Sequence, residues 1–472
     1  MTAAEWITRV GGSDRVRRST EAILAEISRS ELFKDDGEIV VARAPGRLDV
    51  MGGIADYSGS LVLEWPLADA TIVALQRDRA PRLTIDSGPR HAEMTLQDIL
   101  PLDYGAAQTL FAADPVTHWA AYVAGAFIVL AREEGVELSS GARVLVTSTV
   151  PEGKGVSSSA AIEVAAMMAI CAAYGVTLAP RRLAQLCQTV ENLIAGAPCG
   201  VMDQMTAALG EPARLLALLC QPAEVRGHLT VPDGLALWGI DSGIRHEVSG
   251  ADYGTVRAAA FMGRRILEEL TGRRIDYLAN MQPAEFGTIT PRVPESLTGH
   301  EFLERYQGMA DSVTTVDPDR VYPVRAATAH PIYEHARVRE FAEALSRFER
   351  PETPDPTMLA RVGERVGALM YESHASYSAC GLGSDGTDSL VASVRCAGPA
   401  SGLYGAKITG GGSGGTVAIL GRTDAGVVVE AIAQRYARQR GHAARVFSGS
   451  SPGAAACGIC ELRPRGTSSS RP

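Results

Sequence analysis

Aromatic residues and basic charge are both scarce in this sequence of 472 residues. Phe, Trp and Tyr together make up 6% of the chain, and the formal net charge at pH 7 is −9. Proteins that bind nucleic acids by neutralising phosphate groups need clustered Lys and Arg, whereas this chain has only short pairs such as Arg264-Arg265. The composition therefore predicts that nucleic acid is not a partner.

Long apolar runs and a basic leader are missing as well. The longest apolar stretch, residues 164–176, is too short to span a bilayer and is expected to be a buried helix. The first residues, Met1 to Trp6, do not form a basic segment followed by an apolar core, which is what a signal peptide needs. We therefore expect a cytoplasmic protein with no membrane partner.

The eight cysteines lack the regular spacing of a disulfide framework, and they are expected to be reduced, buried thiols. Cys457 and Cys460 form one C-x-x-C, but no second pair and no adjacent His completes a zinc site. The 46% hydrophobic content is ample for a buried core, and the length suggests two or three domains.

A loop rich in Gly and Ser, residues 150–161, lies between a predicted strand (residues 142–149) and a predicted helix (residues 162–174). Gly153 and Gly155 let the backbone approach a ligand, and the free N–H groups of the first helical turn attract anions. The loop predicts a phosphate site. A plain Gly/Ser helix start explains these residues equally well at this point.

The hydroxyls of the loop add to its chemistry. Ser157, Ser158 and Ser159 can cap the helix, contact phosphate oxygens or ligate Mg²⁺. The pattern differs from the usual P-loop, because Lys154 is followed by Gly155 instead of Ser or Thr.

A second unusual stretch, from Arg43 to Gly59, places charged groups among small residues. We expect a strand over residues 38–44 that breaks at Pro45-Gly46, followed by a turn that exposes Arg47 and Asp56. Polar groups on loop backbone serve ligands more often than they serve cores. A surface turn with solvated charges is the alternative interpretation.

Two polar residues, Asp203 and Gln204, lie in a stretch that otherwise looks buried. A buried carboxylate needs a partner or a function, and Glu191 is a possible companion carboxylate. By contrast, the aromatic stripe of His118, Trp119, Tyr122 and Phe127 at helical spacing is expected to belong to the core.

Near the C-terminus, residues 404–420 contain a formal G-x-G-x-x-G at Gly410, Gly412 and Gly415. The motif runs into β-prone residues instead of a helix, which disfavours a dinucleotide-binding fold. A glycine-rich turn that joins two strands can instead place its backbone against a ligand.

The remaining pattern is that of a mixed α and β protein. Hydrophobic periodicity predicts helices over residues 13–33, from residue 114, and over residues 180–195, 330–346 and 358–377; strands are predicted over residues 214–220 and 235–240.

Three of these motifs, in this order and spacing, resemble the GHMP kinase superfamily, which includes galactokinase, homoserine kinase and mevalonate kinase. Pro45 to Gly59 resembles its sugar-kinase signature, Pro151 to Ala161 its phosphate loop, and Lys407 to Gly415 its third, Gly-rich motif. The likeness to galactokinases extends over nearly the whole chain, through Glu191, Pro198 to Gln204, Ser242 to His246, Tyr253, Glu372 to His374 and Gly449 to Gly453. Residues 46–57 and 151–155 are most similar to the kinase domain of plant-type L-arabinokinases.

The resemblance implies an α+β fold, the two-domain GHMP kinase fold, with the active site between the domains. Residues 1–220 would form a ribosomal protein S5 domain 2-like N-terminal domain, and residues 221–462 a ferredoxin-like C-terminal domain. Residues 463–472 are polar and are expected to be a disordered tail.

The resemblance also implies that MgATP phosphorylates the anomeric hydroxyl of a sugar, with Asp203 as the base and Arg47 as the group that stabilises the developing charge. The implied sugar contacts are Asp56, Gly53, Ile54, Gly200 and Tyr253. The implied ATP and phosphate contacts are Gly153, Lys154, Gly155, Val156, Ser157, Ser158, Ser159, Ala160, Gly411 and Gly412. The implied Mg²⁺ ligands are Ser158 or Ser159, together with Glu191.

One departure from galactokinases bears on the substrate. Galactokinases have G-E-H-x-D-Y where this chain has Gly52 to Tyr57, so that Gly53 and Ile54 replace a Glu and a His that hold sugar hydroxyls. L-Arabinopyranose has the ring stereochemistry of galactopyranose but lacks the C6 hydroxymethyl group that the missing Glu would bind. The substitution favours L-arabinose and its 1-phosphate as substrate and product. A galactokinase and a catalytically silent sugar sensor are the alternatives, and the chain is expected to be a monomer or a weak homo-oligomer.

Overall fold

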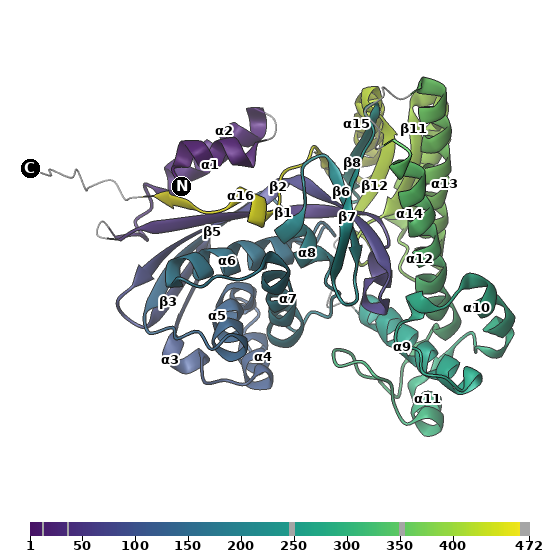
Figure 1. The fold of residues 1–472 in the computed structure, drawn as a ribbon, viewed down its shortest axis with the longest axis horizontal. Helices are drawn as coiled ribbons and strands as arrows, with labels where there is room; N and C mark the ends of the chain where they lie inside the picture. The colour runs from purple at the N-terminus through teal and green to yellow at the C-terminus, as the bar shows by residue number, and fades with distance from the viewer. Residues whose placement is uncertain (12–13, 35–36, 245–250, 349–354, 463–472) are drawn as a thin grey trace, which may run out of the picture.

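A computed structural model describes the chain except for residues 12–13, 35–36, 245–250, 349–354 and 463–472. The described residues form two units, each with its own β-sheet covered by helices (Figure 1). The predicted disordered tail, and Arg245 and His246 of the galactokinase-like stretch, lie outside the described residues. Among the helices that are described, none combines the length and the apolar character needed to cross a membrane.

The first sheet has eight strands, in the order β14-β1-β2-β5-β3-β4, with β6 on β2 and β7 on β6. Their bounds are β1 Ile39–Met51, β2 Leu61–Asp78, β3 Arg82–Ser87, β4 Arg90–Thr95, β5 Gly141–Ser148, β6 Arg214–Leu219, β7 Glu224–Thr230 and β14 Cys460–Leu462. The pairs are antiparallel except β3 with β5, which is parallel.

Helices cover both faces of the first sheet (Figure 1). On one face lie α1 Ala3–Val10 and α2 Asp14–Ile27, whose apolar residues pack on β1 and β2. On the other face lie α3 Leu96–Ile99, α4 Tyr104–Ala112, α5 Ala121–Glu133, α6 Ser158–Tyr174, α7 Pro180–Val190 and α8 Met202–Leu209. This second face holds the larger core, and its helices α6 and α8 begin next to the candidate site.

The second sheet has four antiparallel strands in the order β11-β12-β8-β13. Their bounds are β8 Leu235–Asp241, β11 Leu403–Ile408, β12 Thr416–Arg422 and β13 Val446–Ser448. The helices of this unit are α9 Ala251–Thr271, α10 Pro283–Ile289, α11 Gly299–Tyr306, α12 Val324–Ser346, α13 Pro356–Ala379, α14 Asp385–Ala397 and α15 Gly426–Arg440. A short pair of strands, β9 Leu297–Thr298 and β10 Val321–Tyr322, lies beside α11 and α9.

Most of the predicted elements are present, with ends displaced by a few residues. The predicted helix 180–195 is α7 continued by a π-helical turn, η3 Glu191–Ala195, and the helices predicted over 330–346 and 358–377 are α12 and α13. The predicted helix 13–33 is confirmed only as far as Ile27. The Gly-rich stretch joins β11 to β12 and does not lead into a helix, as predicted.

The strand predicted to break at Pro45-Gly46 instead runs on to Met51, so this prediction is wrong. The pairing of β1 with β2 shifts register between Pro45 and Arg47, and such a bulge accommodates a proline inside a strand. Arg47 therefore lies on a buried strand and is not exposed on a loop. Asp56 is also buried, on the short 3₁₀ helix η1 Gly53–Ser58.

Two segments beyond residue 220 belong to the first sheet. Strand β7 pairs with β6, and β14 pairs with the start of β1. The short helix α16 Ala454–Cys457 also contacts α8 and β1. The chain thus returns to the first unit after completing the second.

Candidate active site

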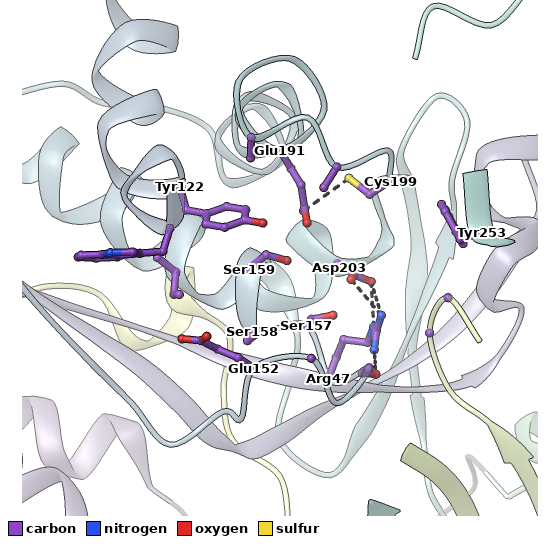
Figure 2. A pocket seen from close by; sticks show the side chains of 18 of the residues that line it. Arg47, Tyr122, Glu152, Ser157, Ser158, Ser159, Glu191, Cys199, Asp203 and Tyr253 are labelled. Atoms are coloured by element: carbon purple, nitrogen blue, oxygen red, sulfur yellow. Dashed lines mark hydrogen bonds and ion pairs between the residues drawn. The ribbon is translucent and has the colours of Figure 1, made fainter. Parts of the chain in front are cut away.

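A cavity of about 530 Å³ is lined by residues from β1, η1, the loop before α6, α8, α9 and the turn between β11 and β12 (Figure 2). Both units contribute, because Tyr253, Gly410 and Gly411 belong to the second and the other lining residues to the first. Most of the predicted site residues line it: Arg47, Ile54, Asp56, Gly153, Gly155, Ser157, Ser158, Ser159, Glu191, Gly200, Asp203, Tyr253 and Gly411.

Five predicted residues do not line this cavity: Gly53, Lys154, Val156, Ala160 and Gly412. Lys154 points its ammonium group at Asp241, 3.1 Å from Oδ2. The hydroxyl of Thr416 donates a hydrogen bond to the Lys154 carbonyl at 2.8 Å. These contacts tie the loop before α6 to the second sheet, and they leave ligand contact by Lys154 a prediction.

The three serines of the loop stand at the start of α6. Ser157 has φ +60°, in the left-handed region, and α6 begins at Ser158. The Ser157 hydroxyl is buried and has no hydrogen-bond partner among the described residues. Buried polar groups are normally paired, and the N-terminus of a helix attracts anions. The arrangement therefore suits the phosphate groups of a ligand.

Arg47 and Asp203 form a two-pronged ion pair on the cavity wall (Figure 2). Arg47 Nε donates to Asp203 Oδ1 at 2.8 Å, and Nη2 donates to Oδ2 at 2.9 Å. Nη1 donates to the Gly155 carbonyl at 2.7 Å. This geometry fixes the plane of the Asp203 carboxylate, and it fastens Arg47 to the backbone of the loop before α6.

Neighbouring carboxylates keep the buried Arg47 side chain positively charged. Burial alone lowers the pKa of Arg47, but the carboxylates of Asp203, Glu64 and Asp49 offset this and raise the pKa above its ordinary value. Glu64 Oε2 lies 3.4 Å from Arg47 Nε, and burial raises the pKa of Glu64 well above its usual range. Arg47 is therefore a permanent cation beside Asp203.

Asp56 is a buried carboxyl group on the same wall. Its Oδ1 has no hydrogen-bond partner among the described residues. Burial, and then the charge of Asp203, raises its pKa to about 7, although Arg257 acts in the opposite direction. A Cβ atom at Gly200 would lie 1.7 Å from Asp56 Oδ2, so that Gly200 leaves room for this carboxyl group. A buried, unpaired carboxyl oxygen on a residue that lines a cavity suits a ligand hydroxyl.

Glu191 lies at the start of the π-helical turn after α7, and its carboxylate points toward Ser159 and Asp203 (Figure 2). Gln204 Nε2 donates to Glu191 Oε2 at 2.5 Å and to Glu163 Oε2 at 3.1 Å. Burial, and then the charge of Asp203, raises the pKa of Glu191 to about 7. Burial, and then the neighbouring Glu191, raises the pKa of Glu163 well above its usual range.

The donors around Glu191 match a hard divalent cation. Carboxylate and hydroxyl oxygens are the ligands that Mg²⁺ prefers, and Mg²⁺ takes its remaining ligands from water and substrate phosphates. Within the described part of the chain, no cluster of three or more His, Cys, Asp or Glu could hold a metal ion. A cation here would therefore depend on ligand phosphates beside Glu191 and the loop serines.

One end of the cavity, which carries the solvent-exposed Arg90 and Glu152 and is called the open end below, was not predicted. His118, Trp119 and Tyr122 line it, although the sequence pattern placed them in the core; of that stripe only Phe127 is fully buried. Helical spacing shows that residues share a face, but it does not tell whether that face meets a core or a cavity. The core prediction is confirmed for Phe127 and is wrong for His118, whereas Trp119 and Tyr122 pack partly against the core and also line the cavity.

A surface ion pair, Arg90–Glu152, lies beside Trp119 at this end of the cavity. Arg90 Nη1 and Nη2 donate to the two carboxylate oxygens of Glu152 at 2.7 and 2.8 Å. The Arg90 guanidinium carbon lies 6.0 Å from the centre of the Trp119 ring. Arg90 carried no sequence signal, and Glu152 lies in the Gly/Ser loop but was not predicted as a site residue.

Comparison with known proteins places the chain. Residues 121–211 match the GHMP kinases N terminal domain, residues 30–77 the galactokinase galactose-binding signature, and residues 357–439 the GHMP kinases C terminal domain. The chain is 30% identical over 406 residues to a galactokinase of Chloroflexus aggregans (strain MD-66 / DSM 9485), covering 85% of this chain and 89% of that protein. The chain belongs to the GHMP kinase superfamily.

Two further likenesses refine this assignment. This GHMP kinase is 44% identical over 504 residues to an L-arabinokinase of Arabidopsis thaliana, covering 92% of this chain and 48% of that protein, so it spans about half the length of that relative. The crystal structure of Lactococcus lactis galactokinase complexed with galactose matches with a TM-score of 0.72 at 20% identity, over 93% of this chain and all of that one. The predicted α+β, two-domain GHMP kinase fold is confirmed.

Proposed function

We propose that this GHMP kinase transfers the γ-phosphoryl group of ATP to the anomeric hydroxyl of L-arabinose, forming L-arabinose 1-phosphate and ADP. The observation that carries the proposal is the Arg47–Asp203 pair, which lines the same cavity as the buried carboxyl of Asp56 and the serines at the start of α6. The likeness to an L-arabinokinase supports the choice of sugar.

In this mechanism Asp203 orients the anomeric hydroxyl and accepts its proton. The hydroxyl oxygen then attacks the γ-phosphorus, and ADP leaves. Because Arg47 holds both oxygens of Asp203, the carboxylate cannot rotate away from the hydroxyl. The fixed positive charge of Arg47 also stabilises the negative charge that develops on the transferred group.

The phosphates would lie between the start of α6 and the turn that carries Gly410 and Gly411. The unpaired Ser157 hydroxyl and the first N–H groups of α6 are donors for phosphate oxygens. Mg²⁺, held by Ser158 or Ser159 and by Glu191, would supply further charge neutralisation on the phosphates. The adenosine would occupy the open end, where Trp119 offers an aromatic face.

Sugar recognition would rest on Asp56, Tyr253, the backbone at Gly200 and the side chain of Ile54, all of which line the cavity. Ile54 supplies an apolar surface that suits a sugar without an exocyclic hydroxymethyl group. Gly53 does not line the cavity, and its contribution to recognition would be indirect.

The test is ADP release by the purified protein with MgATP, measured with L-arabinose and D-galactose at equal concentrations, with Asp203→Asn as the inactive control. We expect turnover on L-arabinose well above that on D-galactose. Faster turnover on D-galactose would instead make the protein a galactokinase. Absence of ADP release with either sugar would contradict the proposal and direct attention to sugar binding without catalysis.

A further inference from the structure

Tyr377, which does not line the cavity, fills the space that a side chain at Gly53 would occupy. Gly53 opens η1 with φ +41°, and a Cβ atom built there would lie 1.5 Å from the Tyr377 hydroxyl oxygen and 2.5 Å from Asp49 Oδ2. No side chain fits at position 53 while Tyr377 keeps its place. The glycine of the sugar signature and the tyrosine of α13 are thus structurally linked across a long stretch of sequence.

The Tyr377 hydroxyl joins two walls of the cavity. It accepts a hydrogen bond from the Ile54 N–H at 2.8 Å. The hydroxyl has two acceptors within reach of its own hydrogen, the Gly410 carbonyl at 3.0 Å and Asp49 Oδ2 at 3.3 Å. Ile54 and Gly410 both line the cavity, on the sugar signature and on the Gly-rich turn respectively. One buried oxygen atom therefore holds the backbone of both.

The tyrosine ring is held independently of its hydroxyl. Tyr377 is fully buried, His330 packs edge-on against it at 5.1 Å, and Lys407 Nζ lies 5.0 Å from the ring centre. Lys407 is fixed in turn by an ion pair with Asp49 at 2.6 Å, in which both side chains are fully buried. Replacing Tyr377 by Phe should therefore leave the ring in place and remove only the oxygen.

We propose that Tyr377 is a positioning residue that sets the sugar selectivity of the site. By fixing the Ile54 backbone against the Gly410 turn, its hydroxyl holds the Ile54 side chain where an additional sugar substituent would lie. Without it, the Ile54 N–H would be buried and unpaired, and η1 could relax away from the cavity. The substrates in this inference rest on the proposed function; the packing of Gly53 against Tyr377 does not.

The selectivity test compares kcat/KM for L-arabinose and D-galactose in the unmodified protein, in Tyr377→Phe and in Tyr371→Phe. Tyr371 is a half-buried tyrosine on the same helix that does not line the cavity, so Tyr371→Phe controls for the loss of a hydroxyl from α13. We expect Tyr377→Phe to lower the ratio of kcat/KM for L-arabinose to that for D-galactose roughly tenfold, mainly through a lower KM for D-galactose, because Ile54 would then leave room for the additional substituent. The control should leave the ratio unchanged.

A reduced kcat for both sugars with an unchanged ratio would overturn the inference, because that outcome describes a merely structural tyrosine. Failure of the unmodified protein to use L-arabinose would contradict the proposed function by itself. A failure of the inference appears only in Tyr377→Phe, whereas a failure of the proposed function appears already in the unmodified protein.

A second measurement needs no activity. Gly53→Ala should lower the thermal unfolding midpoint by several degrees in the unmodified protein, because the new methyl group collides with the Tyr377 hydroxyl. The same substitution made in Tyr377→Phe should lower the midpoint less, because the shortest contact is then gone. Equal decreases in the two backgrounds would overturn the packing on which the inference stands. Gly254→Ala on α9, where a Cβ atom meets nothing within 4 Å, is the matched control.

Discussion

The two ends of the cavity are built by different means. At the inner end, charged groups are buried and fixed by several partners, as in Arg47, whose guanidinium binds Asp203 and the Gly155 carbonyl. At the open end, the Arg90–Glu152 pair is about half exposed, with side chains 43% and 52% accessible to solvent. The charges at the inner end are thus fixed and mostly buried, with side chains 4% and 18% accessible for Arg47 and Asp203, whereas water can screen the charges at the open end.

This difference decides what each end can do. Electrostatic interactions are strong where water is excluded, and removal of one buried partner leaves the other uncompensated. An exposed pair contributes little to stability, because its charges are solvated with or without a partner. Under the proposed function, the inner end would serve the chemical step and the open end the exchange of nucleotide. Four substitutions test this contrast.

The largest effect is expected from Asp203→Asn at the inner end. Removing the proton acceptor should lower kcat by about a hundredfold to ten-thousandfold, while the amide still fills the space beside Arg47. Coupled ADP release measures the loss, and thermal unfolding checks that the protein remains folded. A kcat within tenfold of the unmodified protein would mean that Asp203 is not the base.

Asp56→Asn should change how stability depends on pH. The pKa of Asp56 is raised from 3.8 to about 7, so between these values the folded protein binds a proton that the unfolded chain has lost. Its contribution to the free energy of unfolding therefore falls as pH rises through this interval. Relative to the unmodified protein, Asp56→Asn should gain about 2 to 4 kcal/mol between pH 5 and pH 8.

Urea unfolding of both proteins at the two pH values measures this change, because the other titrating groups cancel in the difference. An equal difference at pH 5 and pH 8 would show that the Asp56 carboxyl is not perturbed by its surroundings.

Gly200→Ala should impair sugar binding. The added methyl group would fall 1.7 Å from Asp56 Oδ2 and must displace that carboxyl group from the cavity wall. We expect KM for the sugar to rise about tenfold with a smaller change in kcat. Steady-state kinetics at saturating ATP measures both parameters, and Gly254→Ala again serves as the control. An unchanged KM would place the sugar elsewhere.

The smallest effect is expected from Arg90→Ala at the open end. The free energy of unfolding should change by less than about 1 kcal/mol, as for other exposed ion pairs. KM for ATP should rise about two- to fivefold at low salt, and the increase should shrink at high salt, where exposed charges are screened. A decrease in kcat as large as that expected for Asp203→Asn would show that the two ends of the cavity do not differ in this way.

The local parts of the site were predictable because their residues are adjacent in the sequence. A β-branched run, a Gly/Ser loop and an Ala-rich helix identify β5, the phosphate loop and α6, since each step follows from propensity and period. The Gly-rich stretch before β-prone residues likewise identified the turn between β11 and β12. In these segments, the residues that form the sequence pattern are the same residues that form the local structure, so the prediction needs no distant partner.

The parts that were missed depend on partners distant in the sequence. Pro45 indicated the end of a strand, but pairing with β2 carries β1 through a bulge at that point. Trp119 was placed in the core because a face shared with Phe127 cannot show where the protein surface is hollowed. Tyr377 carries no motif, and its role becomes visible only when α13 packs against η1.

The return of the chain to the first sheet has a consequence for the order of assembly. Arg47 lies on β1, whose outer neighbour is β14, and Asp203 lies on α8, which contacts α16. During synthesis these neighbours, residues 454–462, emerge after the whole second unit. Until then, one side of the start of β1, at Ile39–Val41, is an unpaired strand edge, open to association with other chains. On that side, the strand that carries Arg47 is paired by residues that follow the whole second unit in the sequence.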